Sequence, residues 1–267
     1  MQAKFSPRIS RILFRILTIC ALATLLGSLR TTKIDIGTAV TVINPGSGTA
    51  ARTAETIRYQ DTDLQLIGVY RVVDGRLEET ALPEYRRIWT LAEDTLPAEP
   101  LSHIRQLNIV TDGPARTLAM VHRSTSERDT WILSVDPAES QDVLQRTLVH
   151  ELAHLYTLGE GDLTAQRTSC AGRLLAIGCA HSQSLLAGYA DRFWAGVSEP
   201  ALHSDGDFVT QYAADSVHED LAETFMSWVY AAEPASSTIE AKYGWFDGIA
   251  LFVTARAEIQ TKLQLTS

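Results

Sequence analysis

The chain has 267 residues, of which 45% are hydrophobic and 21% are charged, so it can bury the core of a globular domain and is not disordered. Its formal charge at pH 7 is −9. The first 30 residues carry five basic residues and no acidic one, which leaves a formal charge of −14 on the rest of the chain. An acidic body of this kind argues against nucleic acid and against an anionic membrane surface as partners.

Residues 1–30 have the features of an export signal. Basic residues up to Arg15 precede an apolar stretch from Ile16 to Leu29, which is shorter than the ~20 residues of a comfortable membrane span. No Ala-x-Ala-like cleavage site follows Leu26, so an uncleaved N-terminal anchor is an alternative to a cleaved signal peptide. Both alternatives predict an exported protein whose body lies outside the cytoplasm and touches a membrane only through this segment.

The rest of the chain divides into a linker and one domain. Residues 31–53 are rich in Thr, Gly and Ala and contain the breaker cluster Asn44–Gly48, so we interpret them as a linker. Residues 54–267 are expected to form the domain. Its first strand is predicted from Leu64 to Val73 and ends at the turn signal Asp74-Gly75.

A helix and three β-rich segments are expected next. Helical spacing of apolar residues extends from Pro83 to Leu96. The β-rich segments are Gln106–Thr111, Thr117–His122 and Thr130–Val135. Within the last of these, Trp131–Val135 is our candidate for a strand that borders a binding cleft and pairs with an extended peptide. An ordinary core strand is the alternative for this segment.

The most informative motif is His150-Glu151-x-x-His154, which lies in the apolar segment Leu144–Leu158. On a helix, residues four apart share one face, with Cβ atoms about 5–6 Å apart. Two imidazoles so placed can bind one zinc ion, and the Glu beside the first can act as a general base toward water. This is the HExxH pattern of zinc hydrolases, and it predicts His150 and His154 as metal ligands and Glu151 as the catalytic base. Two histidines that are solvated or hydrogen-bonded on a core helix are the alternative.

A catalytic zinc site needs a third protein ligand and one open position. Glu160 stands where the metzincin pattern HExxHxxGxxH has its third histidine, but Thr157 occupies the position of the Gly that this pattern needs. We therefore favour a second segment, in which Ser216 and Glu219 can form a capping box that starts a helix.

Glu219 and Glu223 share one face of that predicted helix, opposite its apolar residues. Two carboxylates on an otherwise apolar helix need a partner, which a metal and a metal-bound histidine can supply: one Glu binds the ion and the other orients an imidazole. Asp220 competes with Glu219 if the helix begins one residue later. The alternative without a metal is that Glu219 caps the helix and Glu223 is solvated.

Together the two motifs resemble the gluzincin metallopeptidases, and among them the catalytic domain of anthrax lethal factor and its bacterial relatives. In this chain the motifs are His150-Glu151-x-x-His154 and Tyr212-x6-Glu219-x-x-x-Glu223. The resemblance implies Zn²⁺ as the cofactor, Glu219 as the third ligand, Glu223 as the residue that supports the ligands and Tyr212 as a donor to the transition state. It covers only these two short segments and says nothing about the substrate.

The cysteines leave an open alternative. Cys20 belongs to the leader, and Cys170 and Cys179 form an even pair in the body. In an exported chain such a pair suggests a disulfide. The segment between them looks helical, however, which would hold the two sulfurs apart.

We therefore predict an α+β, zincin-like fold: a small twisted mixed sheet packed on the HExxH helix, followed by a mainly helical C-terminal half. The predicted function is zinc-dependent hydrolysis of peptide bonds in a peptide or protein substrate. Two alternatives are a zinc-stabilised binding or scaffold module without turnover, and a zinc amidase or esterase of the cell envelope. His218 adjoins Glu219, and we expect it to be exposed or hydrogen-bonded rather than a ligand.

Overall fold

A computed structural model describes residues 64–113, 117–197, 199–201 and 206–265, together with four three-residue strands nearer the N-terminus. The predicted leader, residues 1–30, and Cys20 within it lie outside the described residues. The four short strands form two antiparallel pairs, β1 with β4 and β2 with β3. Their bounds are Ile34–Ile36, Val40–Val42, Arg52–Ala54 and Ile57–Tyr59, in the order β1 to β4. The division of the chain into leader, linker and domain stays a prediction.

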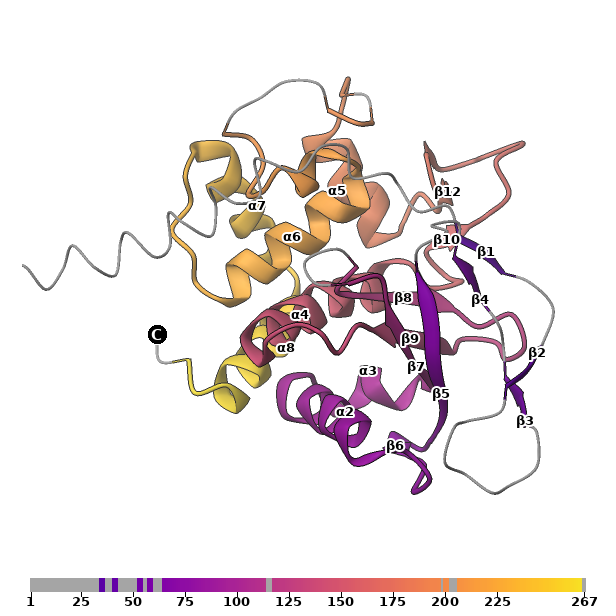
Figure 1. Cartoon of the computed structure of the whole chain (residues 1–267). Coiled ribbons are helices and arrows are strands. Elements are labelled where there is room, and N and C mark those ends of the chain that lie inside the picture. The colour runs from indigo at the N-terminus through magenta and orange to yellow at the C-terminus, as the bar shows by residue number, and fades with distance from the viewer. Residues whose placement is uncertain are drawn as a thin grey trace, which may run out of the picture.

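The main sheet has five strands in the order β6-β5-β7-β9-β8, and β5, β7, β9 and β8 lie side by side in Figure 1. The strands are β5 (Gln65–Val73), β6 (Arg76–Leu77), β7 (Ile104–Thr111), β8 (Ala119–Arg123) and β9 (Trp131–Val135). The sheet is mixed, because β7 and β9 are parallel whereas β5 with β7 and β8 with β9 are antiparallel. Asp74 and Gly75 make the predicted turn between β5 and β6, and both adopt positive φ, 50° and 72°.

The strand that we expected to border a cleft is not at the edge of the sheet. β9 has β7 on one side and β8 on the other, and all five of its residues are buried. A continuous apolar run is typical of such an inner strand. β8 is the edge strand instead, and within the described part of the chain it pairs with β9 alone. The prediction that Trp131–Val135 borders the cleft is therefore wrong, and the core-strand alternative holds.

The helix with the HExxH motif is α4 (Gln141–Thr157), which follows β9 directly. The side chain of Ser140 caps its N-terminus by accepting a hydrogen bond from Val143 N. Leu144, Leu148 and Leu152, spaced by four, are buried in the hydrophobic core, which is how an amphipathic helix attaches to a sheet. Two helices between β6 and β7, α2 (Pro83–Thr95) and α3 (Ala98–Ser102), also pack against α4.

The C-terminal part is mainly helical. It contains α5 (Leu185–Phe193), the 3₁₀ turn η2 (Tyr212–Ala214), α6 (Val217–Val229), α7 (Ser237–Asp247) and α8 (Ala250–Lys262). Figure 1 shows α5, α6 and α7 above α4, with α6 directly next to it. The rings of Phe225, Phe246 and Phe252 lie 5.0–5.7 Å apart and join α6, α7 and α8. The predicted α+β fold, a mixed sheet on the motif helix followed by a mainly helical part, is confirmed.

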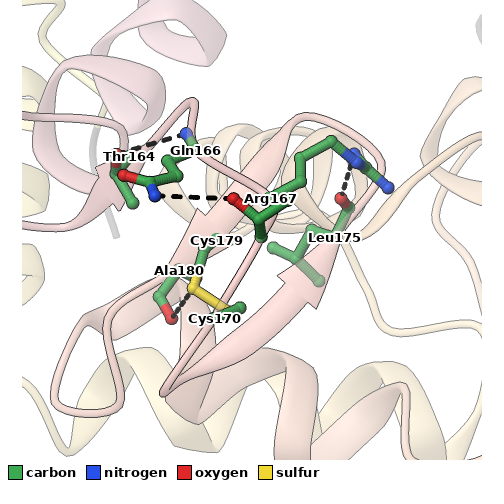
Figure 2. Close-up of a disulfide and its surroundings, with 8 residues drawn as sticks. Thr164, Gln166, Arg167, Cys170, Leu175, Cys179 and Ala180 are labelled. Atoms are coloured by element: carbon green, nitrogen blue, oxygen red, sulfur yellow. Dashed lines mark hydrogen bonds between the residues drawn. A yellow bond between two sulfur atoms is a disulfide. The ribbon is translucent and has the colours of Figure 1, made fainter.

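A three-stranded ladder with a disulfide lies between α4 and α5. Its strands, in the spatial order β10-β12-β11, are β10 (Leu163–Thr164), β12 (Gly178–Ala180) and β11 (Arg173–Leu175). Cys170 and Cys179 are bonded to each other across it, and the Arg167 side chain donates to the carbonyl of Leu175 (Figure 2). A disulfide indicates an oxidising compartment outside the cytoplasm.

The segment between the two cysteines is not helical, as its sequence suggested, but forms the hairpin of β11 and β12. The two glycines show why the chain can fold this way. A Cβ on Gly172 would lie 2.0 Å from the carbonyl oxygen of Ala180, and one on Gly178 would lie 2.3 Å from that of Thr164. Only glycine therefore fits at these two positions, where the backbone of a neighbouring segment passes so closely. No helix among the described residues is long and apolar enough to cross a membrane.

Candidate metal centre

The packing of α4 against α6 brings His150, His154 and Glu219 together. His150 Nε2 lies 3.1 Å from His154 Nε2 and 3.0 Å from Glu219 Oε2, and His154 Nε2 lies 3.5 Å from the same oxygen. Tetrahedral zinc with bonds of about 2.0–2.1 Å places its ligand atoms about 3.3–3.4 Å apart. The three atoms therefore have the spacing of three ligands around one metal ion, and the three residues form a group that could hold one.

Two buried polar atoms of this group need a partner. Glu219 Oε2 and His154 Nδ1 are buried and have no hydrogen-bond donor or acceptor within the described ranges. A buried carboxylate oxygen without a donor costs free energy, and a cation beside it removes that cost. Two imidazole nitrogens and one carboxylate oxygen are the protein donors of one class of catalytic zinc site. The residues present therefore fit a divalent ion of this kind.

The charges of the site also favour a cation. Burial disfavours the carboxylate form of Glu219, but His154 and His150 outweigh it and lower its pKa well below the usual value. Burial likewise disfavours charged His150, yet the adjacent carboxylates of Glu219 and Glu223 raise its pKa well above the usual value. Positive charge is thus stabilised between these side chains. A divalent ion supplies that charge while the imidazoles stay neutral, as ligands must be.

Glu223, one turn after Glu219 on α6, contacts the other nitrogen of His150. Its Oε1 lies 2.8 Å from His150 Nδ1, and its Oε2 accepts a hydrogen bond of 2.7 Å from the hydroxyl of Thr210. A carboxylate in this place fixes the ring orientation of a metal-binding histidine and raises its basicity. This is the position that the predicted supporting role requires.

Glu151 faces the edge strand. It is 5% exposed, and its Oε2 accepts a hydrogen bond of 2.9 Å from Val121 N on β8. Burial raises the pKa of Glu151, and Glu219 adds to this, although His154, His150 and the Val121 amide oppose the increase. A carboxylate with a raised pKa is a stronger base. The hydrogen bond also places this base directly beside β8, whose outer side pairs with no other strand among the described residues.

Tyr212 lies next to His150. Their rings are stacked, with centroids 6.0 Å apart and planes inclined by 24°. Although Tyr212 as a whole is 37% exposed, desolvation of its hydroxyl raises the pKa of Tyr212 well above its usual value, and the nearby carboxylates, Glu219 first among them, raise it further. The hydroxyl therefore stays protonated and can donate a hydrogen bond.

The two rival ligands are occupied elsewhere. Glu160 Oε2 pairs with Arg128 Nε at 2.8 Å. Asp220 is completely buried and accepts hydrogen bonds of 2.8 Å from both Lys242 Nζ and Trp194 Nε1. Asp220 therefore belongs to a buried ion pair of the helical part, where it fixes the rotation of α6, and neither residue belongs to the metal-ligating group.

Replacing Lys242 should destabilise the domain strongly. Lys242 is 1% exposed, and Lys242→Met leaves the carboxylate of Asp220 buried without its cation, which costs about 3–5 kcal/mol of unfolding free energy. Lys262→Met is the matched control, because Lys262 is exposed and, within the described ranges, its Nζ donates to the backbone oxygens of Glu93 and Leu96 rather than to a carboxylate. Urea unfolding of both variants gives the two values. An equal decrease in the free energy of unfolding of the two variants would show that the buried pair of Lys242 and Asp220 contributes no more to stability than the exposed Lys262.

His218 lies closer to the site than the sequence indicated. Its side chain is 16% exposed, and its Nε2 lies 3.4 Å from Glu219 Oε1. Its Nδ1 lies 2.8 Å from the hydroxyl of Ser216, in keeping with the expected hydrogen-bonded state. Burial lowers its pKa to about 4, so it is neutral at neutral pH and can donate from Nε2 toward Glu219. Its position next to Glu219 was the only sequence signal for this role.

A scan of protein-family models and searches of curated proteins and of solved structures find no match to this chain. The candidate metal centre therefore rests on the geometry of its own residues.

Proposed function

We propose that the chain is a zinc-dependent metallopeptidase of gluzincin type. The observation that supports this most strongly is the group His150, His154 and Glu219, whose three ligand atoms lie within 4.8 Å of one another, with Glu151 beside it. A structural zinc is normally closed by four protein ligands and has no use for an adjacent buried Glu. Three ligands and a buried base are instead what a hydrolytic site needs.

The chemistry follows from the residues around the ion. Zn²⁺ held by His150, His154 and Glu219 would lower the pKa of a bound water to about 7. Because Glu151 Oε2 is engaged by Val121 N, its Oε1 is the oxygen that accepts the proton of the attacking water. Glu151 then passes this proton to the leaving amine. The Tyr212 hydroxyl donates to the oxyanion that develops on the scissile carbonyl.

The outer edge of β8, which pairs with no strand in the described ranges, favours an extended peptide as the substrate. Leu118 O and Ser124 N bond to the β9 side of the hairpin, whereas Val121 N points the other way, to Glu151. In an antiparallel pair this alternation directs the backbone groups of Ala119, Val121 and Arg123 outward. A peptide that adds to this edge passes directly by Glu151. This edge takes over the role that we first assigned to β9.

The same chemistry serves a zinc amidase or esterase of the cell envelope, and a binding module would keep the metal without turnover. The open edge beside Glu151 favours the peptidase over both. The acidic body and the disulfide support an exported enzyme with a peptide or protein substrate, without nucleic acid, and with membrane contact only through an uncleaved N-terminal segment.

Peptide cleavage by the zinc-loaded chain tests this proposal. The full chain is incubated with a library of unstructured peptides, and new termini are identified by mass spectrometry. We expect cleavage that stops when a chelator is added and returns with Zn²⁺. Zinc-loaded chain that cleaves no peptide but hydrolyses amides or esters of cell-envelope fragments would replace the peptidase by the amidase or esterase. Loaded chain that hydrolyses neither would support the binding module.

A further inference from the structure

We propose that Thr210 is a positioning residue of the metal centre, which orients His150 through Glu223 and at the same time holds the turn that carries Tyr212. The inference rests on the metal binding of the proposed function, but not on turnover. Thr210 precedes η2, in a loop outside both sequence motifs. Its hydroxyl nevertheless contacts both Glu223 and the turn that carries Tyr212.

The hydrogen bonds of Thr210 have a defined direction. Its Oγ1 accepts a hydrogen bond of 3.1 Å from Ala213 N, and its hydroxyl donates to Glu223 Oε2 at 2.7 Å. Because an ionised carboxylate only accepts, the proton of this bond comes from Thr210. The other oxygen, Glu223 Oε1, accepts in turn from His150 Nδ1 at 2.8 Å. Glu223 therefore accepts at both of its oxygens, from the Thr210 hydroxyl on one side and from the His150 imidazole on the other.

The acceptor oxygen of Glu223 selects the tautomer of His150. With the proton on Nδ1, the lone pair of Nε2 points toward His154 Nε2 and Glu219 Oε2, at 3.1 and 3.0 Å. That is the position where the geometry places the ion. A carboxylate that loses one of its two partners can rotate away from the imidazole, and the ring then loses both its orientation and its tautomer preference.

The same hydroxyl restrains Tyr212. Ala213 lies in η2 directly after Tyr212, and its N–H bonds to Thr210. The Tyr212 ring stacks on that of His150 at a centroid distance of 6.0 Å. One side chain thus couples a candidate ligand to the candidate oxyanion donor. Because Thr210 itself is exposed, replacing it by the isosteric Val removes the hydroxyl without creating a cavity.

Zinc affinity measures this role, because a merely structural residue would leave it unchanged. Partners that orient metal ligands are worth about 10–100-fold in metal affinity. Thr210 acts one bond further out, so we expect about tenfold weaker zinc binding in Thr210→Val, at the low end of that range. Thr210→Ser keeps the hydroxyl and should restore the affinity to within about twofold of wild type.

The experiment titrates Zn²⁺ into the full chain in competition with a chromogenic chelator. Thr261→Val is the control, because Thr261 is also exposed and its hydroxyl donates 2.7 Å to a backbone oxygen, that of Ala257. Wild-type affinity in Thr210→Val, or equal weakening in Thr210→Ser, would overturn the inference. If wild type and variants rank as expected but cleave no peptide, the inference holds and the proposed function fails. A wild-type chain that binds no zinc overturns both.

Discussion

Glu219→Ala should abolish zinc binding by this protein, whereas Glu160→Ala should leave it intact. Glu219 Oε2 lies 3.0 Å from His150 Nε2 and 3.5 Å from His154 Nε2, so its loss removes one of three protein ligands. If roughly 10–12 kcal/mol of zinc binding is shared among three ligands, each is worth about 3–4 kcal/mol, or roughly two to three orders of magnitude in affinity. Elemental analysis after dialysis should find about one zinc per chain in wild type and Glu160→Ala, and none in Glu219→Ala.

The two variants are well matched. Both remove a glutamate, and the Glu219 side chain is not needed for the helix cap, because the hydroxyl of Ser216 accepts its bond from the backbone N–H of Glu219. Circular dichroism should therefore show a folded protein in each case. Zinc that is lost with Glu160→Ala and kept with Glu219→Ala would move the third ligand to the turn after α4 and contradict the geometry of the site.

Glu151→Gln should keep zinc and lose activity. Gln has the shape of Glu, and its carbonyl oxygen can still accept the hydrogen bond from Val121 N. It cannot accept the proton of water at neutral pH, so the contribution of general base catalysis is lost, which is worth about 10²–10⁴-fold in rate. The measurement pairs the rate of peptide cleavage with the zinc content of the same sample.

The control for Glu151→Gln is its affinity for zinc. Glu151 is not among the three residues that could hold the ion, so its replacement should change zinc binding little. A variant that retains zinc and cleaves at the wild-type rate would show that Glu151 is not the base. A variant that loses zinc would show instead that Glu151 holds the metal.

The two halves of the candidate site could be predicted because each is local. A spacing of four residues on a helix places His150 and His154 on one face, and does the same for Glu219 and Glu223. Both helices begin at a capping serine that the sequence displays, Ser140 for α4 and Ser216 for α6. What the sequence could not provide was the distance between the halves, since this depends on how α6 packs on α4.

The misplaced edge strand has a different cause. β9 is next to α4 in the chain, and this proximity suggested that it borders the site. The hairpin from β8 to β9, however, places the earlier strand on the outside of the sheet. The burial of every residue from Trp131 to Val135 agrees with an inner strand. The unbroken apolar run was thus a better guide than the position in the chain.

Other details depend on tertiary contacts that leave no pattern in a single sequence. Gly172 and Gly178 are needed only because the backbone of another strand passes within reach of their Cβ positions. Thr210 contacts Glu223 because the loop before η2 crosses α6. Spacing rules cannot predict such a crossing, since they describe neighbours on one element.

X-ray absorption at the zinc edge of the loaded full chain tests the central claim most directly. We expect about four nitrogen and oxygen ligands at about 2.0–2.1 Å, with the scattering of two imidazoles, which fits His150, His154, Glu219 and one water. This result would place an open, hydrolytic zinc site between α4 and α6. A third imidazole in the shell, or a sulfur at about 2.3 Å, would contradict it, because the zinc would then be bound by other protein ligands.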